Sequence, residues 1–209
     1  MTFRQYTKKL FDDYDLVLSD IQLKSILGFE RLFTEHPPKA DTSGYEFVEI
    51  DSADSFDTIW RSRGMYMIAS DFEPNLEKRD GCRLRIEGLP VIYRGQADLV
   101  RERVQSHLDN TRYVKTKDKK KQGTWTRCLK LDRKPGNGGI DCYVAPYQNY
   151  RWVVVVLPLR DSTTEFRNCA EWGFDAVFGK PIASNERVQG PSKSILDDAR
   201  VRFAHDQPE

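Results

Sequence analysis

The sequence lacks the features of several protein classes. No apolar stretch in its 209 residues is long enough to cross a bilayer, and its start, MTFRQYTKKLFDDYD, has no apolar segment typical of a secretion signal. Its four cysteines and three histidines are scattered without a CxxC pair, which argues against structural zinc and favours reduced, half-buried thiols. We therefore expect a cytoplasmic protein without a membrane partner, built on one sizeable core or on a small core with an attached lobe.

The net charge is only +1, but acids are scarce in one segment of the chain and bases are scarce in another. The segment 111–135 contains ten lysines and arginines but only two acids, whereas the segment 1–60 contains twelve acids and six bases. Such segregation is typical of a protein that binds a polyanion. The plainer alternative for the basic segment is a solvated, flexible loop.

Hydrophobic periodicity predicts both helices and strands. The expected helices are 3–35, 98–108, 162–178 and one from 192 onward, and the expected strands are 64–70, 83–87, 91–93 and 151–159. The S-x-x-E pattern of Ser162 and Glu165 indicates a capping box at the start of the third helix. Gly95 is expected to permit a sharp turn from strand to helix. These elements predict an α+β fold with a small central antiparallel sheet flanked by helices.

Within the second helix, Val100, Val104 and Leu108 form the apolar stripe expected to face the core. Arg103 and His107 are also four residues apart, on a face offset by about 100°. They could point together into a cleft. Arginine and histidine at this spacing are more commonly a solvated helix face, so the pair needs support from other motifs.

Those motifs are GMY at 64–66, YRG at 93–95, Arg103 eight residues after Gly95, and the later EWGFDAVFGKPIASN, residues 171–185. Together they resemble the GIY-YIG nuclease superfamily, including its restriction endonucleases, over residues 62–187. The resemblance implies two tyrosines on adjacent strands, an arginine on the following helix, and a glutamate on a later helix that binds one divalent metal. Together with the helical patterns at both ends of the chain, it gives three expected regions: an N-terminal helical lobe (1–60), a nuclease domain (61–190) with insertions at 71–90 and 111–145, and a C-terminal helix and tail (191–209).

The sequence departs from the common pattern of that family. Tyr66 and Tyr93 are more widely spaced than in compact members, which requires an inserted hairpin between them. Arg94 replaces an apolar residue and Gln96 replaces a frequent Lys, Ser or Thr. The stretch between His107 and the glutamate is also far longer than a minimal domain needs. These differences affect the expected substrate more than the expected chemistry.

Each candidate catalytic residue has a chemical role in phosphodiester hydrolysis. Glu171 offers a hard oxygen ligand for Mg²⁺ or Mn²⁺, and Arg103 can stabilise phosphate charge. Tyr66 would accept the proton of water only as a phenolate, which requires a nearby cation to lower its pKa. His107 could take that proton instead, or relay it from the tyrosine. Tyr93 is expected to orient water or phosphate.

Structural alternatives exist for these residues. Tyrosines in strands are commonly core residues. Glu165 competes with Glu171 as the ligand, but the capping box already explains Glu165. Glu171 and Asp175 form a like-charge pair four residues apart, which is unfavourable without a nearby cation. A metal would supply that cation, although two solvated surface acids are the simpler explanation.

The predicted function is a metal-dependent, restriction-type DNA endonuclease that acts on double-stranded DNA, with a homodimer as one possible form. Tyr113 and Trp125 could stack on bases, and Asn185 could bind phosphate or merely shape a loop. Two alternatives stay open: a non-catalytic nucleic-acid-binding module of the same fold, and a nuclease subunit of a repair or defence complex whose acidic lobe binds a protein. The expected DNA-binding residues are Arg94, Lys117, Lys119, Lys120, Lys121, Trp125, Arg127 and Asn185.

Overall fold

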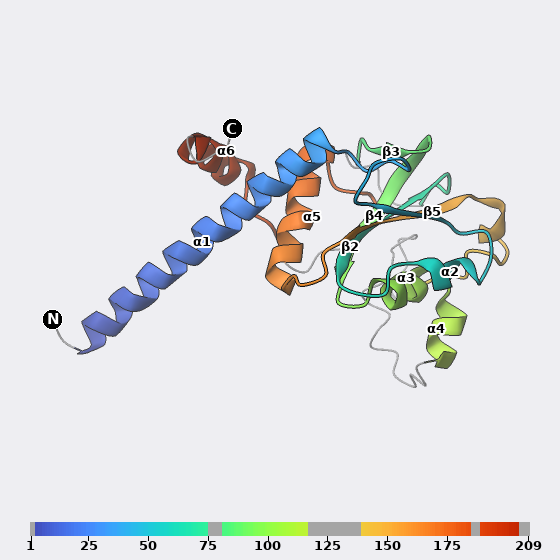
Figure 1. Cartoon of the computed structure of the whole chain (residues 1–209), viewed down its shortest axis with the longest axis horizontal. Helices are drawn as coiled ribbons and strands as arrows, with labels where there is room; N and C mark the ends of the chain where they lie inside the picture. Colours follow the sequence, from blue (N-terminus) through green and yellow to red (C-terminus); the bar gives the residue numbers. More distant parts are fainter. Residues whose placement is uncertain (1–2, 75–80, 117–138, 185–188, 205–209) are drawn as a thin grey trace.

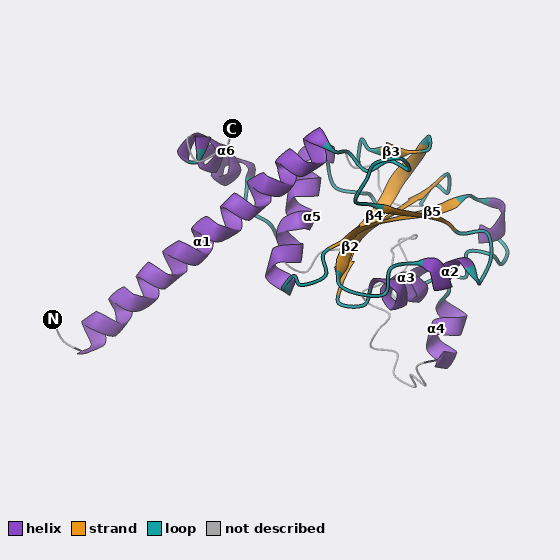
Figure 2. Cartoon of the chain, viewed as in Figure 1, coloured by secondary structure: helices purple, strands orange, loops and turns teal. Residues whose placement is uncertain are grey.

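The computed structural model describes residues 3–74, 81–116, 139–184 and 189–204. Its fold is α+β: a five-stranded antiparallel sheet in the order β1-β5-β2-β4-β3 with helices on both faces (Figure 1, Figure 2). The elements are α1 (Phe3–Glu35), β1 (Glu46–Glu49), α2 (Ser55–Thr58), β2 (Gly64–Ser70), β3 (Arg85–Ile86), β4 (Leu89–Ala97), α3 (Val100–Leu108), α4 (Asn110–Thr116), the 3-10 helix η2 (Tyr147–Asn149), β5 (Trp152–Pro158), α5 (Thr164–Phe178) and α6 (Lys193–Arg202).

The interior strands are the ones that the sequence marks most clearly. β5 contains four consecutive valines, is buried over most of its length, and lies between β1 and β2. β-Branched side chains suit such a strand because both of its faces are covered. The predicted strands 64–70 and 151–159 are therefore confirmed to within one residue. The short edge strand β1 was not predicted, because EFVE carries too little pattern.

A two-residue turn joins β3 to β4. Glu87 and Gly88 both have positive φ, of 51° and 80°, which is the backbone of a type I′ hairpin turn. The expected extended arm at 83–87 is confirmed only in its centre, because β3 comprises Arg85 and Ile86 and Glu87 belongs to the turn. This hairpin accounts for part of the insertion between the two tyrosines.

The sheet separates two hydrophobic cores. On one face, α1, α5 and α6 pack over side chains that include Met65, Met67 and Val155. On the other face, α2 and α3 pack over Tyr66, Ile68 and other strand residues. The predicted core stripe of α3 is confirmed, since its members are fully buried: Val100, Val104 and Leu108.

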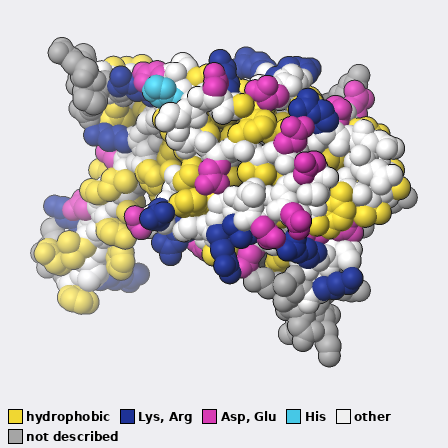
Figure 3. All heavy atoms as spheres, turned by 45° about the vertical axis from the view of Figure 1, so that its right-hand side comes forward, with side chains coloured by type: hydrophobic (Ala, Val, Ile, Leu, Met, Phe, Trp, Pro, Cys, Tyr) yellow, Lys and Arg dark blue, Asp and Glu magenta, His cyan; other side chains and the backbone are white. Residues whose placement is uncertain are grey.

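Helix α1 is as long as predicted, but only its C-terminal part contacts the body. Its buried residues all lie from Leu23 onward, and Asp20 pairs with Arg202 of α6. The part before Asp20 projects as an arm with exposed apolar side chains (Figure 1; lower left of Figure 3). Among the described residues, no helix is both long enough and apolar enough to cross a membrane. The expected N-terminal lobe is also joined to the rest of the fold, because β1 pairs with β5 and Phe56 lies in the second core.

Two helix details differ from the prediction. Helix α5 is capped by Thr163, whose side chain accepts a hydrogen bond from the backbone nitrogen of Phe166, and not by Ser162. Helix α6 is capped by Ser192, as expected. Its buried face contains Leu196, whereas the predicted Ile195 is 48% exposed. In each helix the predicted residue and the observed one are adjacent in the sequence. Sequence patterns alone do not decide which of two adjacent residues caps a helix or faces the core.

The crossing of α1 and α5 depends on Gly173. A Cβ at this position would lie 2.6 Å from the Cβ of Phe29 and 3.0 Å from the carbonyl oxygen of Ile26. The α1 backbone can move away only if the two helices separate. We expect Gly173→Ala to lower the free energy of unfolding by about 1–3 kcal/mol, because overpacking outweighs the higher helix propensity of alanine.

Urea unfolding followed by circular dichroism would measure this change. Gly28→Ala, in α1, is the matched control, because nothing lies within 4 Å of the added Cβ. It should be neutral or stabilising by up to about 1 kcal/mol. Equal effects of the two substitutions would contradict the packing argument.

Candidate active site

Three ring-bearing side chains meet on the α3 face of the sheet. The hydroxyl of Tyr66 lies 2.8 Å from Nε2 of His107, within hydrogen-bonding distance. The ring centroids of Tyr93 and His107 are 4.7 Å apart, and those of the two tyrosines are 6.0 Å apart. Tyr66 and His107 are both 0% exposed. The sequence pattern therefore locates three residues that the fold brings together from two strands and a helix.

The strand register explains this meeting. β2 and β4 pair with Tyr66 opposite Gly95 and Ile68 opposite Tyr93. Residues two apart in a strand share a face, so both tyrosines point toward α3. The next turn of α3 then places His107 beside them, because Val100 and Val104 fix the helix against the same core.

Gly95 provides space and does not form the predicted sharp turn. β4 continues through it to Ala97, so the expected exit into the helix at Gly95 is wrong. A Cβ on Gly95 would lie 2.7 Å from the Tyr66 hydroxyl oxygen and 2.9 Å from Cε1 of Tyr93. The glycine is thus required because the side chains of Tyr66, from the neighbouring strand β2, and Tyr93, from β4 itself, both pass close to its Cα.

We expect Gly95→Ala to displace the Tyr66 ring and lengthen its hydrogen bond to His107. The stability cost should be about 1–3 kcal/mol, typical of an overpacked interior site. Thermal or urea unfolding would measure it, and a crystal structure of the variant would show the shift. Unchanged stability together with an unmoved Tyr66 would contradict this interpretation of Gly95.

Burial sets the protonation of both hydrogen-bonded groups. It raises the pKa of the Tyr66 phenol well above its usual value, and the charge of Arg103 only partly opposes this shift. Burial also lowers the pKa of His107 well below its usual value, and repulsion from Arg103 acts in the same direction. At neutral pH the pair is therefore a neutral phenol and a neutral imidazole. The expected Tyr66 phenolate is not supported, and the Tyr66 hydroxyl lies within hydrogen-bonding distance of Nε2 of the neutral His107 ring.

Two charged groups from different helices act on this cluster. The charge of Arg103, which is partly exposed on α3, influences the pKa values of Tyr66, Tyr93 and His107. The charge of Glu171, on α5, raises the pKa of both tyrosines. The charges of Arg103 and Glu171 thus reach the ring cluster, although the Glu171 carboxylate itself is bound by Arg94 on the α5 face of the sheet. Arg103 and Glu171 are more accessible than the buried rings.

Glu171 is held by Arg94 across the strand. Successive strand residues point to opposite faces, so Arg94 faces α5 while Tyr93 faces α3. Nη1 of Arg94 lies 3.2 Å from Oε1 of Glu171, and its Nε and Nη2 donate to the two carboxylate oxygens of Asp175 at 3.0 and 2.5 Å. One guanidinium therefore binds both acids of α5.

This arrangement corrects two expectations. Arg94 is only 2% exposed, so it is better interpreted as a residue that positions Glu171 than as the predicted DNA contact. The like-charge pair of Glu171 and Asp175 also has a cation from the protein itself, and a metal is not needed to explain it. The sequence contained the signal for this, namely an arginine at a normally apolar strand position.

A second buried arginine, Arg167, was not predicted. Its guanidinium donates to Oε1 of Gln96 at 2.8 Å and to Oδ1 of Asp98 at 2.6 Å, and so joins the start of α5 to the end of β4. It lies one turn before Glu171 on the same helix. Nothing in the sequence distinguishes it from a surface arginine, since its partners are distant in the chain.

Glu171 has the properties of a single-carboxylate metal ligand. Its side chain keeps 13% exposure beside the bond to Arg94, and Mg²⁺ usually takes one or two protein carboxylates with water and phosphate as its other ligands. No group of three or more metal-binding side chains occurs within the described ranges. The residues present therefore fit a metal held jointly with a bound phosphate, and do not fit a closed structural metal site.

The segment after α5 lies alongside β4 and is hydrogen-bonded to it. The backbone nitrogen of Ala183 donates to the carbonyl of Ile92 at 2.9 Å, and that of Arg94 donates to the hydroxyl of Ser184 at 3.0 Å. Asn185, the next residue, lies outside the described part of the chain. So do Lys117, Lys119, Lys120, Lys121, Trp125 and Arg127, the expected DNA contacts of the basic segment.

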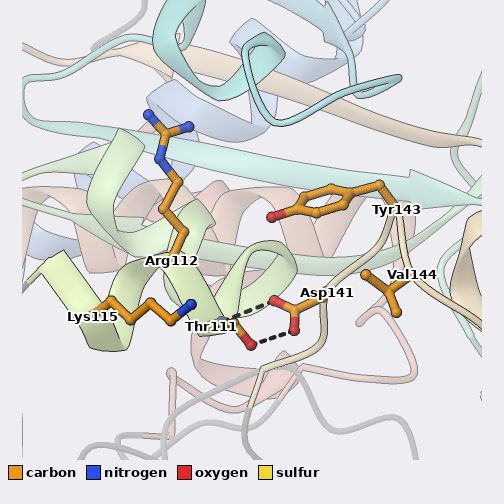
Figure 4. A pocket seen from close by; sticks show the side chains of 6 residues that line it. All are labelled: Thr111, Arg112, Lys115, Asp141, Tyr143 and Val144. Carbon is orange, nitrogen blue, oxygen red and sulfur yellow. Dashed lines mark hydrogen bonds between the residues drawn. The ribbon is translucent and has the colours of Figure 1, made fainter.

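A cavity of about 610 Å³ lies where the described part of the basic segment begins. Thr111 donates to Asp141 on one side of it, and the Lys115 side chain points toward these two residues (Figure 4). The Arg112 guanidinium points away from them and binds Asp57 at 3.2 Å. Two basic side chains of the segment therefore lie at or near this cavity, separate from the tyrosine cluster.

Comparison of the chain with known protein families, with curated proteins and with solved structures finds no match. The geometry of the site is consequently the basis for a functional assignment.

Proposed function

We propose that the protein is a metal-dependent DNA endonuclease that hydrolyses phosphodiester bonds with a GIY-YIG-type site. The observation that carries the proposal is the buried hydrogen bond between Tyr66 and His107, with the charges of Arg103 and Glu171 acting on the same cluster. Buried polar groups with strongly shifted pKa values are characteristic of functional sites. A purely structural tyrosine would not require an arginine and a glutamate from two helices beside it.

The neutral imidazole is the proton acceptor in this proposal. Water that attacks phosphorus gives its proton to the Tyr66 oxygen as the tyrosine hydroxyl passes its own proton to Nε2 of His107. The lowered pKa of His107 keeps Nε2 unprotonated at neutral pH and therefore able to accept. Protons balance in this step, since the imidazole becomes imidazolium and the tyrosine remains a phenol.

Charge stabilisation is assigned to the two accessible groups. Arg103 is permanently protonated and can donate two parallel hydrogen bonds to phosphate oxygens as negative charge grows. Glu171 would hold Mg²⁺ or Mn²⁺, which when bound neutralises charge on the leaving oxygen. Arg94 keeps the Glu171 carboxylate in place and Asp175 shares that guanidinium.

Binding of double-stranded DNA is assigned to the basic segment 111–135. Its excess positive charge would replace counterions on several phosphates, so binding should weaken steeply with salt concentration. This contribution is independent of base sequence. It would position the duplex, and the tyrosine site would carry out the cleavage.

The test is incubation of the purified chain with supercoiled plasmid in Mg²⁺, in Mn²⁺ and in EDTA. The proposal predicts nicked or linear plasmid with either metal and intact plasmid in EDTA. A structured RNA tested in parallel decides the nucleic-acid preference, and DNA cleavage should exceed RNA cleavage. Plasmid that is retarded in a gel but never cut would overturn the endonuclease proposal in favour of a binding module of the same fold.

A further inference from the structure

Residues 139–142, the returning segment, cover the end of α3, the helix that carries His107. α3 is nine residues long and ends at Leu108, so His107 lies in its last turn. The carbonyl groups of a last turn have no partners within the helix, and helix ends fray. A group that binds these carbonyls therefore fixes the turn that carries the imidazole.

The returning segment supplies partners for two of these carbonyl groups. The backbone nitrogen of Ile140 donates to the carbonyl of His107 at 2.6 Å, and that of Cys142 donates to the carbonyl of Leu108 at 2.8 Å. Ile140 and Cys142 are also buried in the second core, which contains Tyr66. The main chain at His107 is thus held by a segment that is itself anchored in the core.

The close approach of the returning segment to α3 depends on Gly139. A Cβ at this position would collide with the carbonyl oxygen of Ser106 and would lie 2.8 Å from that of His107. A larger residue fits only if the segment moves off the helix end. That movement would lengthen the hydrogen bond from Ile140 to His107.

Asp141 ties the same segment to the start of α4. Its Oδ1 accepts a hydrogen bond from the backbone nitrogen of Thr111 at 2.9 Å, and its Oδ2 accepts one from the Thr111 hydroxyl at 2.6 Å (Figure 4). Hydrogen bonds to a carboxylate are stronger than those between neutral groups. The backbone of Asp141 also forms an isolated antiparallel bridge with Asp109. The side chain and the backbone of Asp141 therefore both hold the segment at the junction of α3 and α4.

We propose that Gly139 and Asp141 position His107 for proton transfer by holding the last turn of α3 in place. The proposal rests on the proposed role of His107 as proton acceptor, and it adds two residues that act through the main chain of α3. Proton transfer requires the 2.8 Å approach of the Tyr66 hydroxyl to Nε2 of His107. A frayed last turn would lengthen this approach and admit water to the ring.

Two substitutions of Asp141 isolate the contribution of its hydrogen bonds. Alanine removes both acceptors, whereas asparagine can still accept from the Thr111 nitrogen and can donate to the Thr111 hydroxyl. The two variants carry the same charge. A difference between them therefore reports the hydrogen bonds and not a change in attraction for DNA.

NMR of the full chain provides two measurements that do not require nuclease activity. In Asp141→Ala the amide of Ile140 should exchange with solvent at least about 10-fold faster, because its bond to His107 opens more often. The pKa of His107 should rise toward its ordinary value, because burial is the main cause of its lowering. Asp141→Asn should resemble the wild type in both measurements, and Gly139→Ala should resemble Asp141→Ala.

Plasmid cleavage in Mg²⁺ connects these changes to the proposed function. Asp141→Ala should cleave about 10- to 100-fold more slowly than wild type, as expected when a reacting group is displaced by a distant substitution. Asp141→Asn should recover most of this loss. A wild-type chain that never cleaves would refute the endonuclease proposal, and the exchange and titration results would still decide whether Asp141 positions His107.

Asp71→Ala is the matched control. The Oδ1 of Asp71 likewise accepts from a backbone nitrogen, that of Arg151 at 2.8 Å, but this bond joins the end of β2 to the start of β5. The substitution should change neither Ile140 exchange nor the His107 titration.

Three results would overturn the positioning role of Asp141. They are unchanged exchange and titration in Asp141→Ala, equal changes in Asp141→Asn, and equal changes in Asp71→Ala.

Discussion

Replacing Glu171 with glutamine should abolish Mg²⁺-supported plasmid cleavage while leaving plasmid retention in a gel unchanged. Glutamine has the same shape but no negative charge, so the proposed metal loses its protein ligand. The loss should be at least about 100-fold, as is typical when one electrostatic stabiliser of a transition state is removed. DNA binding should persist because the basic segment is not altered. Nicking rates and gel retardation measure the two effects.

Glu165→Gln is the matched control for this experiment. Glu165 lies in the first turn of the same helix and is exposed. Its carboxylate is hydrogen-bonded to the Thr163 side chain and to the backbone. Its substitution should leave cleavage unchanged. Undiminished cleavage by the Glu171→Gln variant would end the assignment of Glu171 as the metal ligand.

Replacing Arg94 with leucine, the apolar type expected at this strand position, should lower the free energy of unfolding by about 3–5 kcal/mol at neutral pH. The substitution leaves Glu171 and Asp175 together without their shared guanidinium. Burial already raises the pKa of Glu171, and Arg94 is the main group that opposes this shift. Without Arg94 the ionised carboxylate becomes still less favourable in the folded protein.

The pH dependence of this loss follows from the sign of that shift. An acid with a raised folded-state pKa destabilises the fold when it is ionised, and this penalty disappears as falling pH protonates it. The difference between Arg94→Leu and wild type should therefore shrink from about pH 7.5 to about pH 5. Urea unfolding at the two pH values measures it.

Two further variants separate charge from packing. Combining Arg94→Leu with Glu171→Gln and Asp175→Asn should recover much of the lost stability, because no unpaired charge remains. Arg151→Leu breaks an ion pair of 3.0 Å with Glu49, in which both side chains are about half exposed, and should cost less than about 1 kcal/mol. Similar losses for Arg94→Leu and Arg151→Leu would show that burial of the guanidinium is not important.

Local sequence patterns predicted most of the elements in this protein. The valines of β5, the apolar run of β2 and the stripe of α3 each favour one structure strongly, because side-chain periodicity and β-branching act over a few residues. The pattern was weaker at element ends, so Thr163 and not Ser162 caps α5. It also gave no sign of β1, whose partner strand β5 is distant in the chain.

The candidate site also has some features that the sequence predicted and others that it did not. Tyr66, Tyr93, Arg103, His107 and Glu171 were selected from spacing and from the resemblance to GIY-YIG nucleases. The fold brings Tyr66, Tyr93 and His107 into contact, whereas Arg103 and Glu171 influence this cluster through their charges. The expected role of Gly95 was wrong, because a close approach between strands cannot be seen in the sequence. The protonation of Tyr66 was also beyond the sequence, since it depends on burial.

The amino-acid sequence by itself determined where most strands and helices lie and which side chains share a face, because both properties depend on residues a few positions apart. Only the tertiary structure decided that Arg94 binds the acids of α5, that Arg167 joins β4 to α5, and that the arm of α1 leaves the body. Each of these depends on groups distant in sequence, whose burial and charge become defined only when the sheet and helices pack.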